Sequence, residues 1–124
     1  MAYLLDSNLL IYSADAAHSF LRPLMQDPAN YISAISQVET LGFHRLLPAD
    51  KHYLESVFAL LGVLPVSQII IERATLLRQQ QRMALGDALI AATALEYGLE
   101  VATRNVRDFS SITDLAVFNP FPEV

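Results

Sequence analysis

The chain contains no cysteine and only four glycines among its 124 residues. Without cysteine there is no disulfide framework and no zinc site built from thiolates, which is consistent with a cytoplasmic protein. No apolar run approaches the roughly 18 residues that a membrane span requires, and Asp6 interrupts the apolar stretch near the start. We therefore expect no membrane segment and no secretory leader. Glycine-rich phosphate loops are also missing.

Basic residues are scarce: eight Lys and Arg stand against thirteen Asp and Glu, for a formal charge of −5. This balance excludes a protein that binds nucleic acid through net positive charge alone. Seven of the eight basic residues are arginine, which binds phosphate as a planar fork. They include two groups, Arg73 with Arg78 and Arg82, and Arg104 with Arg107. Both groups are equally consistent with solvated helix faces and with phosphate binding.

The length and the 53% hydrophobic content predict one domain, residues 1–124, with a single core. Apolar strand-like and helix-like segments alternate, which predicts an α/β fold with a mainly parallel sheet of four to five strands and helices on both faces. Pro65 places one strand at an edge of the sheet. The expected strands are 2–6, 30–34, 63–66, 99–103 and 115–118. The expected helices are 7–17, 18–27, 36–47, 49–61, 68–82 and 88–97.

Four acidic residues occupy comparable places in this pattern. Asp6 ends the first strand, Glu39 falls in the first turn of a helix, Asp87 begins another helix, and Asp108 follows a strand. In a parallel sheet the carboxyl ends of strands and the amino ends of the following helices share one edge, where ligands bind. We therefore expect these carboxylates to face a common cleft.

Such a cluster needs compensation, because two carboxylates about 4 Å apart repel by roughly 4 kcal/mol at an effective dielectric near 20. Oxygen ligands without cysteine favour a hard cation, Mg²⁺ or Mn²⁺. An ion of this kind binds substrate phosphates and activates water for in-line attack. The chemistry that the cluster indicates is phosphodiester hydrolysis.

Each acid also has a purely structural explanation. Glu39 and Ser36 have the spacing of a capping box, Asp87 would interact favourably with the dipole of its helix, and Asp108 would be an ordinary loop residue. Asp6 is the hardest to explain in this way, because an uncompensated carboxylate at the end of a buried strand is costly.

Four segments resemble the PIN-domain family, particularly its small VapC-type toxins. They are Leu4-Leu5-Asp6-Ser7-Asn8, Ser36-Gln37-Val38-Glu39, Gly86-Asp87-Ala88-Leu89-Ile90-Ala91-Ala92-Thr93-Ala94 and Thr103-Arg104-Asn105-Val106-Arg107-Asp108-Phe109. The resemblance spans nearly the whole chain, and the order and spacing of the segments are more specific than any one of them.

The resemblance implies a PIN-like α/β/α sandwich and a Mg²⁺-dependent ribonuclease, the toxin of a toxin–antitoxin pair. It implies that Asp6, Glu39 and Asp87 surround the metal, supported by Ser7, Asn8 and Thr103. In many relatives the fourth acid occupies the place of Asn105, where this chain has an amide, and the nearest carboxylate is Asp108. The family further implies RNA as substrate, an antitoxin that inserts a basic side chain near the acids, and a homodimer.

Two other functions fit the same residues. In an α/β phosphatase Asp6 would be the nucleophile, but Asn8 stands where a haloacid-dehalogenase-like enzyme would have a second aspartate. A non-catalytic PIN-like module would only bind RNA or dimerise, and retention of Asp6, Glu39 and Asp87 together argues against it.

Overall fold

A computed structural model describes residues 2–122 of the chain. Its centre is a parallel sheet of five strands in the order β3-β2-β1-β4-β5. The strands are β1 (Tyr3–Leu5), β2 (Tyr31–Ser33), β3 (Gly62–Leu64), β4 (Glu100–Ala102) and β5 (Val117–Phe118). The α/β prediction is therefore confirmed, and β3, which ends one residue before Pro65, lies at an edge as expected.

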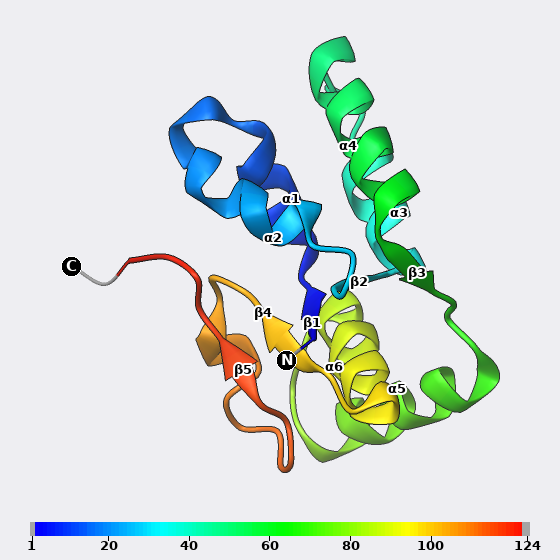
Figure 1. The fold of residues 1–124 in the computed structure, drawn as a ribbon. Helices are drawn as coiled ribbons and strands as arrows, with labels where there is room; N and C mark the ends of the chain where they lie inside the picture. Colours follow the sequence, from blue (N-terminus) through cyan, green and yellow to red (C-terminus); the bar gives the residue numbers. More distant parts are fainter. Residues whose placement is uncertain (1, 123–124) are drawn as a thin grey trace.

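Helices cover both faces of this sheet (Figure 1). The α-helices are α1 (Ser7–Ala14), α2 (Arg22–Gln26), α3 (Ala34–Leu41), α4 (Pro48–Leu60), α5 (Gln68–Gln80) and α6 (Leu85–Tyr97). Two short 3₁₀ helices are η1 (Ala16–Leu21) and η2 (Val106–Asp108). In the described residues, no helix combines the length and apolar character needed to cross a bilayer.

The alternation of side chains along β1 divides the core in two. Leu4 packs with residues of α5 and α6, whereas Leu5 packs with residues of α1, α2 and α4 on the other face. Helix α6 lies close to the sheet because its inner positions are small: its four alanines are fully buried, with 0% of their surface exposed. The alanine-rich segment thus takes the buried place that its composition indicates.

The direction in which the chain builds the sheet reverses beside β1. The strands run from β1 to β2 and β3 on one side, and the chain then returns to place β4 and β5 on the other side (Figure 1). Ligands of open α/β sheets bind at such a switch point, outside the carboxyl ends of the strands. Asp6 follows β1 and Thr103 follows β4, so both lie at this point.

Two local predictions in the middle of the chain are wrong. The helix expected over 36–47 is α3, which begins at Ala34 and ends at Leu41. Its N-cap is Ser33, whose hydroxyl accepts a hydrogen bond from the Ile35 N–H at 3.2 Å. The capping box is therefore absent, and Glu39 lies in the second turn of the helix rather than the first. Ser33 and Ser36 lie three residues apart, and either hydroxyl can cap a helix. The sequence pattern alone does not show which of the two is the N-cap.

Candidate active site

Asp6 is the buried carboxylate at the switch point, with 5% of its surface exposed. Its backbone N–H donates to the Ala102 carbonyl at 3.0 Å, which continues the β1–β4 pairing to the end of the strand. The Thr103 hydroxyl donates to Asp6 Oδ2 at 2.8 Å, and Thr103 Oγ1 in turn accepts the Asn105 N–H at 3.0 Å. Asp6 is thus held in place from two neighbouring strand ends.

Glu39 reaches the same region from α3. Its Oε1 accepts a hydrogen bond from the Ser7 hydroxyl at 2.7 Å, and Ser7 Oγ lies 2.8 Å from Ser36 Oγ. Ser36 is fully buried, so the residue that the spacing suggested as a cap instead supports Ser7. The remainder of Glu39 is exposed, which leaves its carboxylate accessible.

Gly86 brings α6 against Glu39. A Cβ built on Gly86 would lie 2.6 Å from Glu39 Oε2, closer than any real contact of this kind. Glycine therefore allows the first turn of α6 to approach the carboxylate, and this turn contains Asp87. Sequence reasoning treated Gly86 only as part of a helix start and missed this role.

Asp108 comes from η2 and is exposed, but it is close enough for its charge to raise the pKa of both Asp6 and Asp87. Asn105 is also exposed. Together with Asp108 it lines an open hollow on the segment from Arg104 to Ser110. Asp108 adds negative charge to the site, whereas Asn105 would contribute only a neutral amide, so the choice between them stays a prediction. Asn8 is exposed in the first turn of α1, and its supporting role stays a prediction.

The four acids form one electrostatic cluster. Burial is the largest cause that raises the pKa of Asp6, the Thr103 hydroxyl opposes it, and the charges of Glu39 and Asp108 add to it. The pKa of Asp87 rises to about 6, through burial first and then through the charges of Asp6, Asp108 and Glu39. The structure therefore brings together the acids that the sequence pattern placed at one edge.

This cluster predicts how stability depends on pH. Because folding raises the pKa of Asp87 from 3.8 to about 6, the folded state holds the extra proton, and stability falls as pH rises through this window. In EDTA, Asp87→Asn should flatten the fall in melting temperature between about pH 4 and 7 and should raise the melting temperature at neutral pH. Glu55→Gln, on the exposed side of α4, is the control. An unchanged profile in Asp87→Asn would contradict the cluster.

The residues present fit a hard divalent cation. Their donors are carboxylate oxygens, and the repulsion that raises two of their pKa values is the kind that a cation relieves. Within residues 2–122, no three His, Asp or Glu side chains are placed closely enough to hold a metal ion by themselves. A Mg²⁺ ion held here would therefore need water or substrate oxygens beside one or two of these carboxylates.

The fold and the site define a class: an α/β/α sandwich whose carboxylates gather at the switch point of a parallel sheet. A family model described as PIN domain matches residues 3–115. The chain belongs to the PIN-domain family, as its motifs indicated.

Named relatives make the likeness more specific. The chain is 33% identical to Ribonuclease VapC10 of Mycobacterium tuberculosis, over 90% of this chain and 89% of that protein. A toxin–antitoxin complex from Klebsiella pneumoniae contains a chain with 30% identity and a TM-score of 0.78, covering 96% of this chain and 98% of that one. FitAcB from Neisseria gonorrhoeae gives 30% identity and a TM-score of 0.74, covering 97% and 98%.

Proposed function

We propose that this protein is a metal-dependent endoribonuclease, the toxin of a toxin–antitoxin pair, that uses Mg²⁺ or Mn²⁺ to hydrolyse phosphodiester bonds in RNA. The observation that carries the proposal is the convergence of Asp6, Glu39, Asp87 and Asp108 at the switch point of the sheet. The curated relative is named a ribonuclease, which supports RNA as the substrate.

Each acid takes a role that its surroundings support. Asp6 and Asp87, the two whose pKa values are raised, would hold the cation, with Asp108 adding negative charge. When bound, the cation would neutralise charge on the phosphate and favour in-line attack by water. Glu39 is the most accessible of the hydrogen-bonded acids, and Ser7 fixes one of its oxygens, so Glu39 is suited to orient a water molecule and to accept its proton.

The alternatives account for less of the structure. An aspartyl-phosphate enzyme needs an accessible nucleophile, whereas Asp6 is 5% exposed. A module that only binds RNA has no use for several carboxylates that repel one another and the phosphates.

The direct test is cleavage of a labelled single-stranded RNA by the purified chain in Mg²⁺, in Mn²⁺ and in EDTA. We expect cleavage with either metal and none in EDTA, and no cleavage of single-stranded DNA of the same sequence. A phosphorylated Asp6, trapped and detected by mass spectrometry, would favour the phosphatase instead.

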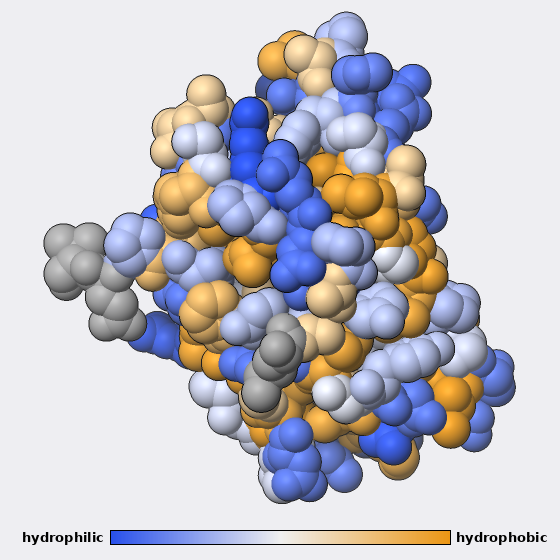
Figure 2. All heavy atoms as spheres, viewed as in Figure 1, coloured by the Kyte–Doolittle hydropathy of each residue, from blue (hydrophilic) through white to orange (hydrophobic). Residues whose placement is uncertain are grey.

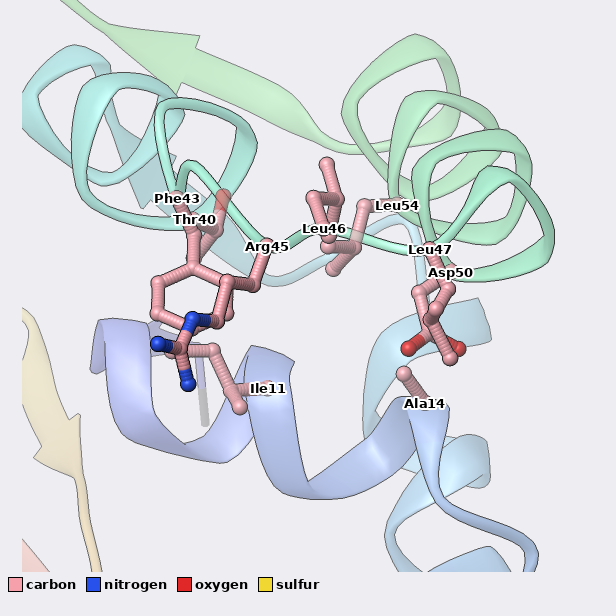
Figure 3. A pocket seen from close by; sticks show the side chains of 9 residues that line it. All are labelled: Ile11, Ala14, Thr40, Phe43, Arg45, Leu46, Leu47, Asp50 and Leu54. Atoms are coloured by element: carbon pink, nitrogen blue, oxygen red, sulfur yellow. The ribbon is translucent and has the colours of Figure 1, made fainter.

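We also propose that the protein binds an antitoxin and that both proteins are located in the cytoplasm. An apolar groove of about 170 Å³ separates α1 from the connection between α3 and α4. Ile11 and Ala14 lie on one side, and Phe43, Leu46 and Leu47 lie on the other (Figure 3). Ile11, Phe43 and Leu47 are 48%, 53% and 63% exposed, and exposed apolar patches mark interaction sites. A solved neighbour is titled as a toxin–antitoxin complex, which supports an antitoxin as the partner, and the apolar lining of the groove favours an apolar segment of it.

A charge in this groove should weaken the complex. Leu47→Asp should lower affinity for the antitoxin by about tenfold or more, because a buried carboxylate would lack a partner, while RNA cleavage by the free toxin stays unchanged. Leu60→Asp, at the far end of α4 and equally apolar at the surface, is the matched control. Calorimetric titration measures both; equal affinities for the two variants would exclude this groove.

The apolar surface is not confined to the groove (Figure 2). Ile69 and Leu76 lie seven positions apart, on one face of α5, and are 51% and 56% exposed. We propose that a second copy of the chain covers this face in a homodimer. Light scattering would then give twice the monomer mass of 13.7 kDa, and a monomer at micromolar concentration would exclude the dimer.

A further inference from the structure

Arg104 rests on two aromatic rings beside the acidic site. Its guanidinium carbon lies 4.2 Å from the ring centroid of Phe121 and 5.1 Å from that of Tyr12. We propose that this stacked arginine is an RNA subsite that binds a backbone phosphate next to the acids, and that the C-terminal segment carrying Phe121 completes it. The proposal rests on the ribonuclease function and adds a residue that positions the substrate.

Phe121 is held where Arg104 needs it. Its ring centroid lies 5.2 to 5.6 Å from those of Tyr12, His18 and Phe20, all in edge-to-face geometry. Its backbone N–H donates to Asn119 Oδ1 at 3.0 Å. The segment after β5 is therefore packed onto α1 and η1, and it presents one ring to the guanidinium.

The position of Arg104 connects it to the acids. It directly follows Thr103, whose hydroxyl binds Asp6. Arg104 and Arg107 line the same open hollow as Asp108, whose charge acts on Asp6 and Asp87. A single-stranded RNA lying in this hollow would pass Arg104, Arg107 and Asp108.

The guanidinium is free to bind a ligand. Among the described residues, no carboxylate lies within 4.0 Å of it and no hydrogen bond uses its donors. The rings of Tyr12 and Phe121 meet at 75°, so the guanidinium plane can lie parallel to only one of them. The N–H groups that do not face a ring keep their charge and hydrogen-bonding capacity for a phosphate.

Arg22 shows the opposite arrangement in the same protein. It also stacks on an aromatic ring, 5.2 Å from the centroid of Tyr53, but its Nε donates to the Ser13 carbonyl and its Nη2 to the Ala14 carbonyl. Two of its five N–H donors bind backbone carbonyls within the fold, which gives Arg22 a structural role. The contrast makes it a matched control.

Local positive charge is needed here for a physical reason. The chain carries a formal charge of −5, and the charges of Asp6, Asp108 and Glu39 act on Asp87, so RNA approaching these acids is repelled. A preorganised arginine offsets this repulsion close to the scissile phosphate and loses little side-chain entropy when RNA binds.

The test combines binding and cleavage. Binding of a fluorescent single-stranded RNA is measured by anisotropy, with Asp6→Asn present in every variant so that the RNA is not cleaved. Kd is determined at about five salt concentrations between 50 and 200 mM, which gives the salt slope. We expect Arg104→Ala to raise Kd about tenfold and to lower the salt slope by about 0.7, the loss of one phosphate contact to a single strand. Arg104→Lys and Phe121→Ala should give intermediate losses, because each keeps the charge but removes the stacking. Arg22→Ala should leave Kd and the slope unchanged.

Cleavage kinetics separate positioning from a structural effect. In the active background, Arg104→Ala should raise KM about as much as Kd, with kcat within about twofold of the wild-type value. Unchanged Kd and slope in Arg104→Ala, with the wild type still cleaving RNA, would overturn the subsite and leave the proposed function intact. Weaker antitoxin binding with unchanged RNA binding would also overturn it and would assign Arg104 to the protein partner. A wild type that cleaves no RNA would refute the function first, and the subsite with it.

Discussion

Asp6→Asn should lower the rate of RNA cleavage by roughly 100-fold or more. The same substitution should not destabilise the protein. Losses of this size accompany removal of single preorganised charged or polar groups in active sites. The amide retains an oxygen that can accept the Thr103 hydroxyl, so the local hydrogen bond survives. Burial raises the pKa of Asp6, which means that its ionised form is disfavoured in the fold. The melting temperature in EDTA should therefore stay the same or rise.

The matched control is Asp114→Asn. Asp114 is exposed and has a φ of 68°, a conformation that Asn adopts as readily as Asp. This variant should cleave RNA at the wild-type rate. Full cleavage by Asp6→Asn in Mg²⁺ would remove Asp6 from the site, and a large loss of melting temperature would show that its role is structural.

Gly86→Ala should also reduce RNA cleavage without lowering the melting temperature, and it adds only one methyl group. The added Cβ would meet Glu39 Oε2, the far end of a flexible and exposed side chain, so Glu39 can move away, and the Ser7 hydrogen bond to Oε1 is the main contact that it would disturb. Alanine is also the better helix former by about 0.5 to 1 kcal/mol. We expect an unchanged or slightly higher melting temperature, with cleavage reduced about tenfold or more because the displaced carboxylate loses its alignment.

A double-mutant cycle identifies the cause. If Gly86→Ala acts by displacing Glu39, the pair Gly86→Ala with Glu39→Ala should be no less active than Glu39→Ala alone. Additive losses would show that the methyl group acts on another part of the site. Wild-type activity in Gly86→Ala would mean that the position of Glu39 is not critical.

The fold was largely predictable because its signals are local. Alternating apolar strands and amphipathic helices need only short-range patterns, and Pro65 marked an edge strand through its missing N–H. The errors arose where two local signals competed. Ser33 and Ser36 are both able to cap α3, and the choice depends on where β2 ends in the sheet.

The proximity of the acids was predictable, but their contacts were not. The edge shared by parallel strands predicted that Asp6 and Asp87 lie together, whereas Glu39 reaches them from the second turn of α3 rather than from the first. The contact of Gly86 with Glu39 and the hydrogen bond from Thr103 to Asp6 join residues far apart in the chain. They depend on the strand order, in which β4 returns to pair with β1, and composition does not encode that order.

The central claim is that these acids together hold a hard cation for hydrolysis of RNA. Anomalous diffraction from a crystal soaked in Mn²⁺ tests it most directly. We expect a peak between the carboxylates of Asp6 and Asp87, within about 2.2 Å of at least one oxygen, and its loss in Asp6→Asn. A peak elsewhere on the molecule, with none near Asp6 or Asp87, would contradict the account.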